Sequence, residues 1–119
     1  MLDKVKYWVK SETIRKPETD KAWFTLRWVT FNPRKFTLNA DDVKDIMRKK
    51  MKKSKEMLET EYDVIYARAT KEGRGDNVRT DYSICVKPFS NTIFLIPNKH
   101  RKEARKAISE LSIKGNFTL

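Results

Sequence analysis

Lysines alternate with an indole near the start of the chain, at Lys4, Lys6, Trp8 and Lys10. Side chains at every second position share one face of a β-strand, so this spacing predicts a strand face on which cations surround an aromatic ring. An indole in that setting can stack a nucleobase while the ammonium groups contact phosphates. The alternative is an edge strand whose lysines block pairing with other sheets, although that role does not require Trp8.

A second stripe of the same kind is expected on the strand 22–31, where Trp23, Thr25 and Arg27 alternate with apolar residues. If the apolar residues face the helices, the stripe faces away from them. Aromatic residues dominate protein cores, so burial of Trp23 is the alternative for this ring. Arg27 is the better candidate for a contact with a partner, because arginines in strands tend to face solvent.

Further basic groups occur in three clusters. The run 48–55 holds six basic residues and no acid, and a solvated helix face with i,i+4 ion pairs is its alternative explanation. A glycine-containing loop at 71–77 could close over a nucleic-acid strand, or could be an ordinary hairpin tip. Cations at the start of the final helix oppose its dipole, which an anionic partner would explain. The predicted nucleic-acid contacts are Lys4, Lys6, Trp8, Lys10, Arg27, Arg48, Lys52, Lys55, Arg74, Arg79, Arg101 and Lys102.

Catalytic signatures are not found in the sequence. No phosphate-binding loop, zinc-protease, serine-hydrolase or dinucleotide-binding pattern occurs. With one histidine, His100, and one cysteine, Cys85, we expect no metal site, no cofactor and no catalytic residue. Carboxylates at Glu61, Asp63 and Asp81 could hold Mg²⁺ in a nuclease, but most basic proteins offer such a set, and this is the least favoured reading.

Composition sets the class of protein. The chain has 119 residues, with 27 Lys and Arg against 16 Asp and Glu, a formal charge of +11. This length predicts one domain over 1–119, and no apolar run approaches the ~20 residues of a membrane span. A single cysteine and the lack of a signal peptide predict a cytoplasmic, reducing location with no membrane partner.

The elements that must position these residues follow from hydrophobic periodicity. We expect strands at 4–10, 22–31, 62–70, 78–87 and 92–96, and helices at 40–60 and 99–113, with a possible edge strand at Phe117 and Leu119. Asn39 is the expected N-cap of the first helix. This order predicts an α+β fold: an antiparallel sheet of five to six strands with two helices on one face, ferredoxin-like in outline, and an extra N-terminal strand.

The leading functional hypothesis is a small, non-catalytic nucleic-acid-binding protein for single-stranded or structured DNA or RNA. The alternative is a protein-interaction module, such as a virus- or mobile-element-encoded inhibitor or adaptor, that docks on an acidic protein or a nucleic-acid-handling complex. The oligomeric state is left open.

Overall fold

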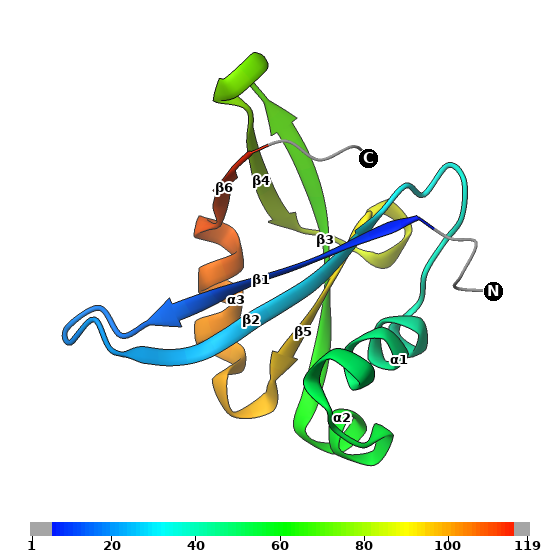
Figure 1. The fold of residues 1–119 in the computed structure, drawn as a ribbon, viewed down its shortest axis with the longest axis vertical. Helices are drawn as coiled ribbons and strands as arrows, with labels where there is room; N and C mark the ends of the chain where they lie inside the picture. Colours follow the sequence, from blue (N-terminus) through cyan, green and yellow to red (C-terminus); the bar gives the residue numbers. More distant parts are fainter. Residues whose placement is uncertain (1–5, 116–119) are drawn as a thin grey trace.

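Six strands form one antiparallel sheet in the computed structural model, which describes residues 6–115. The spatial order is β1-β2-β5-β3-β4-β6, and each neighbouring pair is antiparallel (Figure 1). In chain order the elements are β1 (Tyr7–Arg15), β2 (Ala22–Phe31), α1 (Ala40–Met51), α2 (Lys55–Glu61), β3 (Tyr62–Glu72), η2 (Gly75–Asn77), β4 (Arg79–Ile84), η3 (Lys87–Phe89), β5 (Thr92–Pro97), η4 (Asn98–His100), α3 (Arg101–Glu110) and β6 (Ser112–Lys114).

Helices cover both faces of the sheet, because the central strands are apolar on both sides. The α3-side core joins even-numbered residues of β2 and β5 to the inner face of α3: Phe24, Leu26, Trp28, Phe94, Ile96, Ala104 and Ile108. The α1-side core joins odd-numbered residues of the same strands to α1 and α2: Val29, Phe31, Ile93, Leu95, Val43, Met47 and Leu58. The alternation of side chains along a strand therefore divides the interior into two cores.

The predicted α+β class is confirmed. The finer ferredoxin-like arrangement is not confirmed. Strands β2 and β3 are parallel to each other with β5 between them, as in a split βαβ unit. However, β6 pairs with β4 at one edge, β1 forms the other, and α3 lies on the face opposite α1 and α2, so the expectation of two helices on one face was wrong.

The first predicted helix is two helices. Asn39 caps α1 as expected: its Oδ1 accepts from the Asp42 amide, and the Asp42 carboxylate accepts from the Asn39 amide, both at 2.9 Å. Lys52 then adopts a left-handed conformation with φ of 54°, which ends α1. Ser54 caps α2 by accepting a hydrogen bond from the Met57 amide at 3.2 Å. Serine competes with helical backbone bonding and favours caps, which explains the break.

Several boundaries differ from the prediction. Strand β1 continues to Arg15, so the connection expected at 11–21 is shorter. Strand β4 ends at Ile84, and α3 ends at Glu110, followed by the short β6. The predicted edge strand at Phe117 and Leu119 lies outside the described residues.

No helix within residues 6–115 is long and apolar enough to cross a membrane.

Candidate functional site

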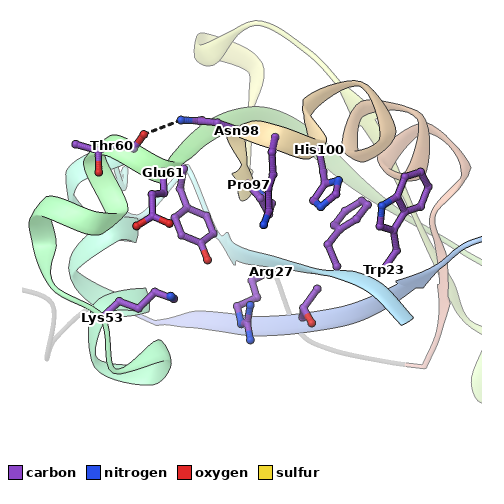
Figure 2. Close-up of a pocket in the computed structure, with 12 residues that line it drawn as sticks. Trp23, Arg27, Lys53, Thr60, Glu61, Pro97, Asn98 and His100 are labelled. Atoms are coloured by element: carbon purple, nitrogen blue, oxygen red, sulfur yellow. Dashed lines mark hydrogen bonds between the residues drawn. The ribbon is translucent and has the colours of Figure 1, made fainter. Parts of the chain in front are cut away.

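A pocket of about 510 Å³ opens at the end of the sheet where β2 begins and β5 ends. Its walls come from three segments: the first half of β2, the stretch 53–62 that includes α2, and the β5–α3 connection at 97–100. Figure 2 shows His100 and Trp23 on one side, Glu61 and Lys53 on the other, and Arg27 between them on β2. Pockets that bind small ligands fall mostly between about 300 and 1,000 Å³.

One side of the pocket is a cluster of rings. His100 stacks on Phe24, with ring centroids 4.8 Å apart and planes 11° from parallel. Trp23 meets His100 and Phe24 edge-on, at 5.6 and 5.8 Å. Phe24 is buried in the α3-side core, so it anchors the exposed part of the cluster. The result is a fixed aromatic wall rather than loose surface side chains.

Three cations and one carboxylate also line the pocket. Arg27, Lys53 and Lys99 line it against one carboxylate, Glu61. Across residues 6–115, no ion pair neutralises these three cations, whereas Arg101 is paired with Asp63 at 3.5 Å. The pocket therefore has an excess of positive charge next to an aromatic wall, a combination suited to a ligand that is both anionic and flat.

A second hollow of about 270 Å³ shares Arg27 with the pocket. It lies against α1, where Lys50 and Met47 line it. Arg27 thus lines both concave regions. Lys50 also lines the second hollow, and Lys53 also lines the pocket.

Local backbone features hold the pocket walls in place. The break between α1 and α2 places Lys53 between Lys52, the C-cap of α1, and Ser54, the N-cap of α2. The Lys53 amide donates to the Arg48 carbonyl at 3.2 Å. The Asn98 side-chain amide donates to the Thr60 carbonyl at 2.8 Å and so joins the end of α2 to the start of the β5–α3 connection (Figure 2).

The structure separates the two strand stripes that the sequence suggested. Trp8 and Lys10 pair in register with Thr30 and Trp28 of the α3 side, whereas Ser11 pairs with Arg27 on the α1 side. Lys10 nevertheless lines the second hollow together with Arg27. Trp8 and Lys10 are half-buried. Burial and the nearby charge of Lys10 lower the pKa of Lys71 on β3. Lys6 is exposed before β1, and Lys4 lies outside the described residues.

The remaining predicted contacts are dispersed. Arg48 on α1 is half-buried, and Lys52 and Lys55 are exposed on either side of the helix break, next to Lys53.

Arg74 and Arg79 belong to the β3–β4 hairpin, at the opposite end of β3 from the pocket (Figure 1). The Arg79 guanidinium donates to the Ser112 hydroxyl at 3.4 Å. Arg101 and Lys102 are exposed at the start of α3, near the pocket, but the charge of Arg101 is shared with Asp63. Of the predicted contacts, Arg27 alone lines the pocket.

Lys53, Lys99 and His100 line the pocket with Arg27 but were not among the predicted contacts, although the basic clusters that contain them were noted. Lys53 lay inside a run expected to be continuous helix, and Lys99 and His100 were expected within the last helix. The available signal was Ser54, whose preference for N-caps marks a helix start just after Lys53.

The carboxylates considered for a nuclease do not converge. Asp63 lies at the pocket end of β3, while Asp81 pairs with Thr70, seven residues further along the strand and thus roughly 23 Å away. Glu61 lines the pocket, and Asp63 is paired with Arg101. Among the described residues, no group of three or more His, Cys, Asp or Glu side chains could hold a metal ion.

No family model, curated protein or solved structure matches the chain.

Proposed function

We propose that the protein binds single-stranded or structured nucleic acid through the α1 side of β2, without catalysing a reaction on it. The observation that supports this is the position of Arg27, which is shared by two hollows lined by Lys50, Lys53 and Lys99 against one carboxylate. A row of cations that are not paired with carboxylates neutralises successive phosphates and releases counterions. The chain's charge of +11 would speed association with any polyanion.

An extended strand fits this surface better than a duplex does. The cations lie around concave regions with an aromatic wall, and bases are free to leave a stack only in single strands, loops and bulges. The setting we propose is a reducing cell interior, since the single cysteine cannot form an internal disulfide.

The test compares two arginine variants that change the net charge equally. Affinity for a labelled single-stranded oligonucleotide is measured by fluorescence anisotropy at several salt concentrations. We expect Arg27→Ala to weaken binding about 5- to 30-fold and to lower the slope of log K against log salt by about 1. Arg74→Ala, at the distant hairpin, should leave affinity within about twofold, because long-range effects of an exposed charge are screened.

Equal losses in both variants, or no salt dependence in the parent protein, would contradict the proposed surface. A loss confined to Arg74→Ala would instead place binding at the β3–β4 hairpin.

A protein-interaction role is the second candidate, and one observation favours it. Val86, just before η3, and Phe89, its last residue, are 61% and 65% exposed, in contrast to the buried apolar residues of the two cores. Arg68 donates to the Phe89 carbonyl at 3.2 Å, so a cation borders this apolar pair. Such a surface suits a partner with an apolar patch bordered by carboxylates. A protein partner that survives nuclease treatment and is released by Val86→Ser and Phe89→Ser would support this role.

A further inference from the structure

The aromatic wall of the pocket is preorganised for a flat ligand. His100 and Phe24 are stacked within 11° of parallel, and Trp23 supports both rings edge-on. The Lys16 ammonium lies 5.8 Å from the Trp23 ring and adds a cation–π contact on this ring. Because these rings already pack on one another, little side-chain entropy is lost when a planar group packs against them.

The phosphate-binding groups lie next to this wall and not on it. Arg27 lies between the ring side and the Lys53 side of the pocket (Figure 2). A guanidinium can bind a phosphate through two parallel hydrogen bonds, and Lys53 can add a second positive charge. A ligand whose aromatic part packs on His100 would therefore hold an attached anionic group near Arg27.

We infer that the pocket binds one unpaired nucleotide, with its base against the wall of His100 and Trp23 and its phosphate at Arg27 and Lys53. This inference rests on the proposed function and deepens it, because it assigns base stacking to the pocket and phosphate contacts to the wider basic surface. The nucleotide can be free or part of a strand, since the same chemistry recognises both. A paired base in a duplex does not expose its ring face and would not enter.

Two ligand pairs test this inference with the intact chain. In the first, chemical-shift changes in the ¹⁵N-labelled protein are followed during titration with adenosine 5′-monophosphate or ribose 5-phosphate, which carry the same phosphate. In the second, a single-stranded oligonucleotide is compared with an abasic phosphodiester oligomer of equal length and charge. We expect the base-bearing member of each pair to bind about 5- to 150-fold more tightly, the range that corresponds to stacking of one base.

His100 provides the variant for this test. His100→Ala should remove the preference for base-bearing ligands and leave the affinity for abasic ligands unchanged. His100→Phe, which keeps a ring, should retain that preference. Thermal unfolding of each variant verifies that the fold is retained. Ser109→Ala, at an exposed and uncharged position of α3 that does not line the pocket, serves as a control.

The outcomes separate the two proposals. Equal affinity for base-bearing and abasic oligomers, with Arg27 still required, would overturn the nucleotide pocket and leave the basic surface intact. Binding of adenosine 5′-monophosphate without binding of any oligonucleotide would overturn the proposed function and assign the pocket to a free nucleotide. Binding of neither base-bearing ligand would overturn both.

Discussion

The two faces of β2 differ in how their hydrogen-bonding and charged groups are arranged. On the α3 side, Trp28 is fully buried, and its indole N–H donates to the Tyr82 hydroxyl at 3.2 Å. On the α1 side, Arg27 lines a pocket and Val29 enters the core. Trp23 lines the same pocket from the edge of the α3-side core. One strand thus contributes both to the closed interior and to the open site.

Strand alternation can separate stability from binding within a few residues. Even-numbered positions of β2 are held by contacts with Phe94 and α3, so the backbone that presents the odd-numbered positions is rigid. A side chain placed on such a backbone loses less entropy on binding than one on a loop. The pocket is therefore supported by the core behind it.

Truncating the two tryptophans of β2 gives the largest expected contrast. Trp28→Ala removes a buried ring that contacts Tyr82 and Phe94, and should lower the free energy of unfolding by about 3–5 kcal/mol. Trp23→Ala should cost about 1 kcal/mol or less, because the ring is only half-buried, while weakening oligonucleotide binding. Urea unfolding and anisotropy measure the two effects. Similar losses of stability in both variants would contradict the division between the buried part of β2 and the part that lines the pocket.

Tyr82 allows the stability of the α3-side core to be tested by its dependence on pH. Burial raises the pKa of its phenol from 10.0 to about 12, more than the hydrogen bond from Trp28 lowers it. Because the folded-state pKa is the higher one, the stabilisation is complete below about pH 10 and is lost as the pH rises towards 12. We expect the free energy of unfolding to fall across this window by about 1–3 kcal/mol.

Tyr82→Phe is the matched variant for that test. It should abolish the tyrosine-dependent part of the alkaline loss and cost about 1–3 kcal/mol at neutral pH, because the Trp28 N–H is left buried without its acceptor. An unchanged alkaline transition in this variant would assign the pH effect to other groups.

The sequence predicted the elements that local signals determine. The apolar pattern of 22–31 predicted β2 to the residue, and Asn39 with Asp42 gave the start of α1. Trp23, Thr25 and Arg27, which the alternation predicted on one stripe, all line the pocket, but so does Phe24, and Trp23 packs against the α3-side core.

The pocket itself could not be predicted, because it is made by elements that are distant in sequence. Which face α3 covers depends on the route from β5, and helical periodicity alone does not specify that route. Trp8 and Arg27 were expected to contribute to one binding surface, but the β1–β2 register places them on opposite faces. Register depends on the length of the hairpin connection, and a shift of one residue reverses every side chain.

The cap between α1 and α2 gives a smaller effect that links stability to the pocket. Ser54→Ala removes the acceptor for the Met57 amide and should lower the free energy of unfolding by about 1 kcal/mol. Since Lys53 precedes this cap, the variant should also weaken oligonucleotide binding. Asn39→Ala removes the cap of α1 at a similar cost but lies away from the pocket, so its affinity should be unchanged. Equal affinities in the two variants would show that the helix break does not position Lys53.

The smallest expected effect distinguishes a paired cation from an unpaired one. Arg101 lies near the pocket and changes the net charge on substitution by the same amount as Arg27, but its guanidinium contacts the Asp63 carboxylate at 3.5 Å with both side chains substantially exposed. Exposed ion pairs contribute about 0–1 kcal/mol, so Arg101→Ala should barely change the free energy of unfolding. Asp63 offsets the charge of Arg101, and we therefore expect oligonucleotide affinity to change less than about twofold, against the larger loss in Arg27→Ala. Comparable losses in the two variants would mean that binding follows total charge, in which case the unpaired position of Arg27 between the two hollows would carry no special weight.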